Sequence, residues 1–164
     1  MKSQKGKRAI KILLATDGSA HSKAAVEGVA RRPFPPKTSV RIISVIDRGS
    51  LTRNMGPLGG LSEYYAEVDR NALKSAEDAI ENATKILRKK NPMLSVTTAV
   101  IEGSPKRAII DEAEKYGAEL IVVGSHGYGV VERFLLGSVS LAVSLHAKCS
   151  VEIVRIKSIR KNKT

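Results

Sequence analysis

Short apolar runs alternate along the chain with longer segments whose apolar residues recur about every 3.6 positions. The short runs are rich in β-branched residues and predict five strands, at residues 10–15, 39–46, 94–101, 120–123 and 150–156. The periodic segments predict four helices, at residues 19–32, 62–90, 105–116 and 138–147. Strands that alternate with helices form a mostly parallel sheet with right-handed crossovers and helices on both faces. The pattern therefore predicts an α/β fold built on one sheet.

Residues that typically end or begin helices, or form loops, lie between these elements. Pro33, Pro35 and Pro36 follow the first helix and end it. Ser104 precedes Pro105, as an N-cap precedes the first residue of a helix, and Gly117 closes that helix. The stretch 47–61 contains four glycines and one proline and predicts a loop. For residues 48–61 of this loop two interpretations stay open: the segment closes over a ligand, or it is disordered.

Length, charge and cysteine content narrow the class of protein. The 164 residues predict a single domain over 1–164. The net charge is +12, but the ends, residues 1–11 and 155–164, contain ten Lys and Arg residues and no acidic residue. This distribution predicts basic flexible tails around a core at about 8–156, and specific nucleic-acid binding is not expected because no aromatic residues interleave with the basic runs.

Two further observations bear on location. Cys149 is the only cysteine, which excludes an internal disulfide and a CxxC zinc cluster. A reducing compartment suits this content, so we expect a cytoplasmic protein. No apolar run approaches the roughly 18 residues of a membrane span, so we expect no membrane contact.

Candidate chemistry lies where two predicted strands end. The first strand ends in Ala15-Thr16-Asp17-Gly18, and the fourth ends in Gly124-Ser-His-Gly127. Gly137-Ser138 follows at the start of a helix. Ligands of open parallel sheets bind at the carboxyl ends of strands. Glycines let backbone N–H groups approach a ligand, and a helix N-terminus attracts anions, so these segments predict a phosphate site.

Other common sites do not fit. A Walker A loop needs a lysine after its last glycine, whereas Gly129 is followed by two valines. The dinucleotide fingerprint would follow the first strand, where this chain has ATDGSA. There is no GxSxG nucleophile motif. No nucleophile or carboxylate is arranged around His126, so we predict no catalytic residue and leave enzyme activity open.

The glycine spacing resembles that of the universal stress protein family. The ATP-binding members of this family carry G-x2-G-x9-G-[S/T], which here is Gly124, Gly127, Gly137 and Ser138. An aspartate after the first strand, here Asp17, is shared. The resemblance covers residues 8–156 and implies an open five-stranded parallel sheet in the order 3-2-1-4-5. This fold is Rossmann-like and similar to the adenine nucleotide alpha hydrolases.

The resemblance also implies a ligand and its contacts. ATP would bind, with AMP and ADP as alternatives, and Mg or Mn would bind through the phosphates. Asp17 and the backbone of Val45 would hold the base and ribose, and the glycine segments would cradle the ribose and phosphates. The predicted ATP-binding residues are Ala15, Thr16, Asp17, Val45, Val123, Gly124, His126, Gly127, Gly137, Ser138, Val139 and Ser140. Relatives often carry an arginine or lysine after the second glycine, where this chain has Tyr128-Gly129.

A partner is implied as well. Family members usually form homodimers by antiparallel pairing of their last strands, here through Val151, Ile153 and Arg155. Such pairing would cover an edge that is otherwise bare. The interpretation is a homodimeric regulatory or stress-response module with at most slow ATP hydrolysis and an unknown protein partner. Two alternatives stay open: a stress protein that binds no nucleotide and acts through protein contacts, and nucleic-acid binding through the basic tails.

Overall fold

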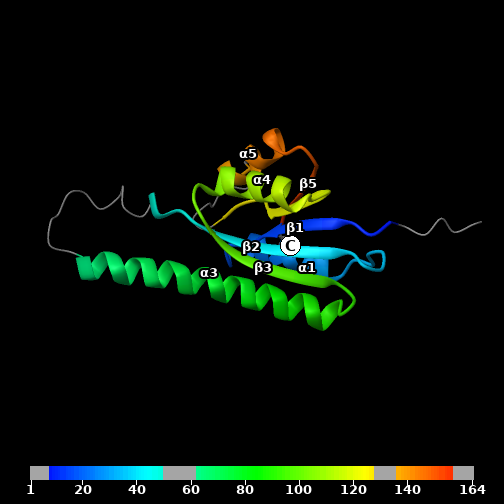
Figure 1. Ribbon diagram of the computed structural model, residues 1–164, viewed down its shortest axis with the longest axis horizontal. Coiled ribbons are helices and arrows are strands. Elements are labelled where there is room, and N and C mark those ends of the chain that lie inside the picture. Colours follow the sequence, from blue (N-terminus) through cyan, green and yellow to red (C-terminus); the bar gives the residue numbers. More distant parts are fainter. Residues whose placement is uncertain (1–7, 50–61, 128–135, 157–164) are drawn as a thin grey trace, which may run out of the picture.

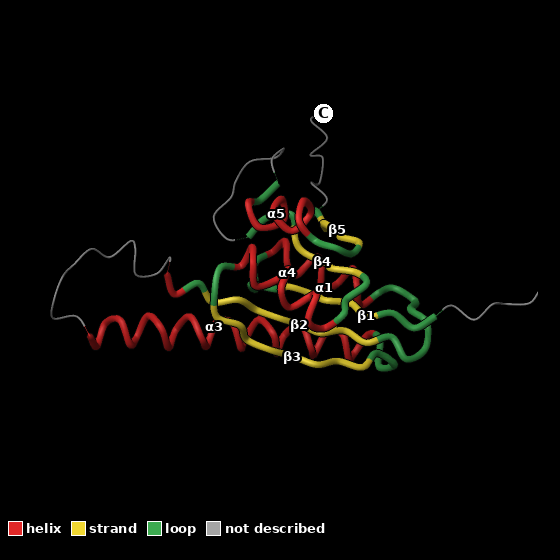
Figure 2. The backbone as a smooth tube through the Cα atoms, turned by 45° about the horizontal axis from the view of Figure 1, so that its top comes forward, coloured by secondary structure: helices red, strands yellow, loops and turns green. Residues whose placement is uncertain are grey.

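The computed structural model describes residues 8–49, 62–127 and 136–156. Its five strands are β1 (Lys11–Ala15), β2 (Ser39–Ile46), β3 (Ser95–Glu102), β4 (Leu120–Gly124) and β5 (Ser150–Val154). All neighbouring strands pair in parallel, in the order β3-β2-β1-β4-β5, which Figure 2 shows from bottom to top. The predicted fold class and strand order are confirmed. Both tails and nearly all of the 48–61 loop lie outside the described residues.

Helices cover both faces of the sheet, as the alternation of elements predicts. They are α1 (Ala20–Ala30), α3 (Ser62–Lys90), α4 (Pro105–Tyr116) and α5 (Ser138–His146). Helices α1 and α3 pack on one face, and α4 and α5 pack on the other (Figure 1). The first half of α3 extends past the strands in both views. None of the described helices is long and apolar enough to cross a membrane.

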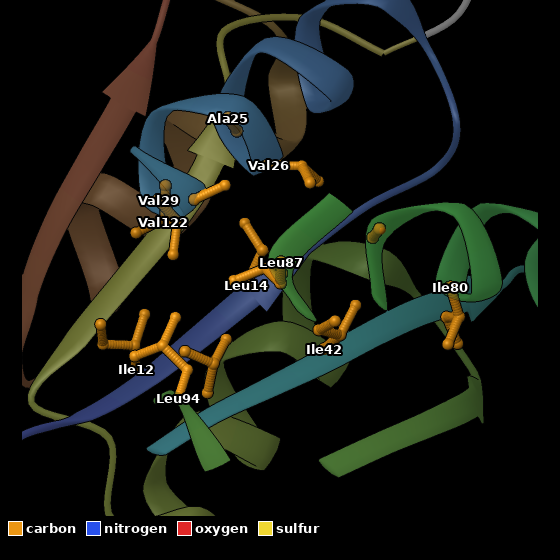
Figure 3. Packing of buried hydrophobic residues seen from close by; sticks show 13 residues of the cluster. Ile12, Leu14, Ala25, Val26, Val29, Ile42, Ile80, Leu87, Leu94 and Val122 are labelled. Atoms are coloured by element: carbon orange, nitrogen blue, oxygen red, sulfur yellow. The ribbon is translucent and has the colours of Figure 1, made fainter. Parts of the chain in front are cut away.

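The alternating side chains of β1 join two cores. Ile12 and Leu14 point to the α1 and α3 face (Figure 3), whereas Leu13 points to the α4 and α5 face. All three side chains are fully buried. A strand in the middle of a parallel sheet is covered on both sides, which explains why its sequence is a continuous apolar run.

Local signals set most element ends. Ser19 is the N-cap of α1, and its Oγ accepts a hydrogen bond from the N–H of Ser22. Gly117 ends α4 with φ 70°, a left-handed conformation that glycine adopts at little cost. Ser104 precedes α4 as predicted, but its hydroxyl makes no capping hydrogen bond. The strand predicted at 94–101 begins and ends one residue later, because its pairing with β2 runs from Ser95 to Glu102.

The strand order reverses direction between β1 and β4. From β1 the chain adds β2 and β3 on one side, and β4 and β5 on the other. The connections that leave β1 and β4 therefore go to opposite faces of the sheet. Open α/β sheets bind ligands at such a switch point, beyond the carboxyl ends of the strands.

Candidate functional site

A cavity of about 280 Å³ lies at this switch point. Its volume is close to the lower end of the roughly 300–1,000 Å³ typical of small-molecule sites. All twelve residues predicted from the sequence line it, together with four that were not predicted. The lining residues are Ala15, Thr16, Asp17, Ser22, Ile43, Val45, Pro105, Ile109, Val123, Gly124, His126, Gly127, Gly137, Ser138, Val139 and Ser140.

The four unpredicted residues come from three elements. Ile43 lies two residues before Val45 on β2, so strand alternation places both on one face, and this signal could have found it. Pro105 and Ile109 lie on the first turns of α4, and Ser22 lies on α1. No local pattern announces that these helices border the cavity, because their placement depends on how they pack on the sheet.

The cavity is apolar at one end and polar at the other. Ile43, Val45, Ile109 and Val123 belong to the core under α4 and present aliphatic surface to the cavity. The polar end combines the β1–α1 turn, the loop after β4 and the start of α5, with Asp17, His126 and Ser138 as polar side chains. A ligand with a flat apolar part and a charged part matches this division.

The β1–α1 turn holds Asp17 in a defined orientation. Its Oδ1 accepts a hydrogen bond from the N–H of Ser19 at 2.9 Å, and Gly18 between them has φ 80°. The N-cap of α1 is Ser19, so Asp17 precedes the helix and does not cap it. The other oxygen, Oδ2, lies toward Gly127, only 2.8 Å from where a Cβ on that glycine would stand.

Hydrogen bonds join the loop after β4 to the start of α5. The N–H of Gly137 donates to the carbonyl oxygen of Ser125 at 2.8 Å. The hydroxyl of Ser140 lies 2.9 Å from the carbonyl oxygens of both Ser125 and Gly137 and donates to them. A Cβ on Gly137 would stand 3.1 Å from the Ser125 oxygen, so glycine allows this close approach. By donating this hydrogen bond, the hydroxyl of Ser140 holds the loop after β4 against the first turn of α5.

Of the helix starts of α1 and α5, which both border the cavity, the N-terminus of α5 is the better anion site. At α1, the side chain of Ser19 occupies the N–H of Ser22, and Asp17 occupies the N–H of Ser19. At α5, the N-cap residue is Gly137, which has no side chain to cap the helix. The N–H groups of the first turn of a helix have no partner within it and carry the positive end of its dipole.

Gly124 has a structural role in addition to its place in the cavity wall. A Cβ there would lie 2.6 Å from the carbonyl carbon of His21 and 2.7 Å from the nitrogen of Ser22. Both are main-chain atoms at the start of α1. The glycine therefore lets β4 and α1 approach each other, and α1 in turn supports the turn that carries Asp17.

His126 lies on the cavity wall without a catalytic arrangement. Its Nδ1 is 3.1 Å from the hydroxyl of Ser125, and its ring centroid is 5.0 Å from that of His21. Its Nε2 is buried and has no hydrogen-bond partner in the described part of the chain. No carboxylate orients it, and residues 8–49, 62–127 and 136–156 contain no group of three His, Cys, Asp or Glu side chains placed to hold a metal ion.

The side chains of Tyr64, Tyr65 and Cys149 lie outside the cavity. Tyr64 is 49% exposed, so it does not pack in the core, and neither Tyr64 nor Tyr65 lines the cavity. Cys149 is half-buried against the α4 and α5 core, and burial raises the pKa of its thiol. That shift fits a packing residue better than a reactive one. Tyr128 and Arg133 lie outside the described residues.

Comparison with known proteins identifies the family. Residues 10–155 match the Universal stress protein family. This chain belongs to that family. Universal stress protein YxiE of Bacillus subtilis (strain 168) is 32% identical over 151 residues, which cover 88% of this chain and 98% of YxiE. The family resemblance predicted from the glycine spacing and Asp17 is therefore confirmed.

Solved structures agree with the fold. The structure of hypothetical protein MJ0577 is 27% identical, with a TM-score of 0.77 over 91% of this chain and 97% of that one. Two more distant structures were solved with ligands. A universal stress protein in complex with cAMP is 20% identical (TM-score 0.60, 90% of this chain and 98% of that one). An Arabidopsis thaliana family member with AMP bound is 16% identical (TM-score 0.66, 91% and 93%).

Proposed function

We propose that this protein is an adenine-nucleotide-binding regulatory module of the stress response, with ATP as its main ligand and AMP and ADP as alternatives. One observation carries the proposal: residues from β1, β2, β4 and α5 that were predicted to bind ATP line a single cavity with an apolar and a polar end. The AMP and cAMP bound to two members of the fold support the adenine nucleotide class.

Each end of the cavity suits one part of a nucleotide. The aliphatic surface of Ile43, Val45 and Ile109 would take the adenine ring. The carboxylate of Asp17, fixed by its turn, would accept hydrogen bonds from ribose hydroxyls. The phosphates would lie at the N-terminus of α5, where Ser138 and Val139 offer backbone N–H groups.

A divalent cation fits the proposal through the phosphates. None of the sixteen lining residues that the structure describes is Lys or Arg, and Asp17 contributes a negative charge. Phosphate charge would therefore be offset by the α5 dipole and by a bound Mg or Mn ion, held mainly by the phosphates because the described residues form no metal cluster of their own. Bound there, the ion would supply positive charge.

The proposed role is binding, with at most slow hydrolysis. Among the described residues, the side chain bonded to His126 is that of Ser125 and not a carboxylate, and one oxygen of Asp17 is engaged by Ser19. We further propose one universal stress protein domain over residues 1–164 and a cytoplasmic location. Homodimers would form through β5, whose outer edge carries Val151 and Ile153, and through Arg155, the residue that follows the strand.

Two measurements test the ligand. Mass spectrometry of small molecules released by denaturing freshly purified protein should detect an adenine nucleotide. Titration calorimetry with Mg²⁺ and ATP, ADP, AMP or cAMP should then rank the ligands, with ATP tightest. Protein that carries no nucleotide and gives no heat with any of the four would overturn the proposal and favour action through protein contacts alone.

A glycine variant tests the location. In Gly127→Ala, the new Cβ would meet Oδ2 of Asp17 at 2.8 Å, and the flexible carboxylate would have to turn away. We expect ATP affinity to fall about tenfold or more, while thermal stability changes little because the carboxylate can move. Gly28→Ala is the matched control, because no atom lies within 4 Å of its Cβ position. Equal ATP affinity in the two variants would refute this placement of the ribose beside Asp17.

A further inference from the structure

The outer edge of β3 is a second unpaired strand edge, at the opposite side of the sheet from β5. Within residues 8–49, 62–127 and 136–156, no strand pairs with this side of β3. The N–H of Ser95 donates to the Thr38 carbonyl in the β2 direction. Backbone groups alternate along a strand, so those of Val96, Thr98 and Val100 face outward.

This edge lacks the devices that usually prevent strand pairing. Residues 95–101 include no charged residue and no proline, and Glu102 at the end of β3 forms an ion pair with Arg48. The pairing with β2 runs through eight successive residue pairs without a bulge. By contrast, β5 is five residues long and carries Glu152, which forms an ion pair with Arg32. An exposed and regular edge whose central residues are uncharged is a template for another strand.

A groove beside this edge carries a charge pattern. It has a volume of about 880 Å³ and runs between β3 and one flank of α3. Its floor includes Val96 and Val100, which pack against the core. The α3 flank carries four charged side chains in the order acidic, acidic, basic, basic: Glu77, Glu81, Lys85 and Arg88. Glu81 and Lys85 also form an exposed ion pair within the helix.

This charge pattern is complementary to itself under a two-fold rotation. A short turn connects α3 to β3, so the basic half of the flank lies toward Ser95 and the acidic half toward Val100. A second copy paired antiparallel at β3 would keep its own α3 on the same face of the sheet. Its Lys85 and Arg88 would then face Glu77 and Glu81 of the first copy.

We propose that the β3 edge binds a second copy of this chain by antiparallel strand pairing centred on Thr98. The outward groups of Thr98 would bond to Thr98 of the partner copy, and those of Val96 to Val100 of that copy. The sheet would continue through ten strands. This contact is independent of the pairing proposed at β5, because the two strands lie at opposite edges.

Site-specific cross-linking tests the register. In a Cys149→Ser background, Thr98→Cys would place the two cysteine Cα atoms about 5.5 Å apart, within the range of a disulfide. Ser95→Cys is the control, exposed like Thr98 but about 20 Å from its counterpart. Under mild oxidation, Cys at 98 should form most of the cross-linked dimer. Equal yields from the two variants would overturn the proposed register.

Charge reversal tests the partner. The double variant Lys85→Glu, Arg88→Glu has a wholly acidic flank, and the double variant Glu77→Lys, Glu81→Lys has a wholly basic one. For each double variant alone, the affinity of self-association at this edge should fall by about tenfold or more, as measured by sedimentation velocity and by cross-linking at position 98. An equimolar mixture should regain pairing because opposite flanks then meet. A mixture that does not regain pairing would show that the edge serves another protein or stays unpaired.

Discussion

Gly124 at the end of β4 lies against the main chain of His21 at the start of α1. A Cβ on this glycine would stand 2.6 Å from the His21 carbonyl carbon, closer than side-chain atoms approach a backbone. The contact fixes the first turn of α1 relative to β4, and thus the Asp17 turn relative to the loop that follows β4. The first glycine of the family motif therefore has a packing reason that holds with or without a ligand.

Replacing this glycine tests that reason. Gly124→Ala should lower the free energy of unfolding by about 1–3 kcal/mol, because a backbone segment must shift to admit the methyl group. Urea unfolding followed by circular dichroism measures the change. Gly28→Ala should instead raise stability slightly, since its Cβ position is open and alanine is the better helix former. An unchanged stability of Gly124→Ala would show that β4 and α1 can separate without cost.

The hydroxyl of Ser140 supports a second prediction. Ser140→Ala removes a buried hydrogen bond to the carbonyls that join the loop to α5 and should cost about 1 kcal/mol of unfolding free energy. It should also weaken ATP binding, because the loop and α5 would no longer be held in register. Ser144→Ala is the matched control, since its hydroxyl bonds to the Leu141 carbonyl on the same helix but away from the cavity. ATP titration of both variants decides the point, and equal affinities would contradict it.

The edge of β5 gives a prediction on assembly. The carbonyl of Val154 accepts from the N–H of Ser125, so the backbone groups of Ile153 face away from β4. Ile153→Pro removes an outward N–H without breaking the β4 pairing and should lower the fraction of dimer formed through β5. Ile153→Ala removes most of the side chain but keeps the N–H, so it separates packing from strand pairing. Light scattering that shows the same dimer in both variants would place the contact elsewhere.

The ion pair between α1 and α3 predicts a pH dependence of stability. The hydrogen bond from Lys90 lowers the pKa of the Glu27 carboxyl below its ordinary value of 4.5, with a further contribution from Arg31. In this range the unfolded chain binds the proton more readily than the folded one. The stabilisation is therefore complete above pH 4.5 and is lost as the pH falls through the folded-state pKa.

Glu27→Gln measures this contribution. Because the pair is partly exposed, the variant should lose up to about 1 kcal/mol at pH 7. The difference from the wild type should shrink at pH 3.5, below the ordinary carboxyl pKa of 4.5, because the unfolded chain then gains stability by binding the proton. Glu81→Gln, which breaks only an exposed pair within α3, should lose less at pH 7. A stability difference that stays constant between the two pH values would contradict the assignment.

The sequence by itself determined the architecture. Continuous apolar runs at β1 and β4 require burial on both sides, and the intervening amphipathic helices provide it, so an α/β sheet follows from the periodicity alone. The glycine spacing and Asp17 indicated the family, and every residue predicted for the ligand lines one cavity. These signals are local, because each depends on the backbone freedom or apolarity of a short segment.

Only the tertiary structure decided what those residues do. It placed Pro105 and Ile109 of α4 over the cavity and set Gly124 against α1. In the folded protein the hydroxyl of Ser140 joins the loop after β4 to the start of α5, and the N-terminus of α5 has no side-chain cap. Each of these features depends on the approach of segments distant in sequence. Such contacts are fixed by how helices pack on the sheet, and the order of residues within a segment does not encode them.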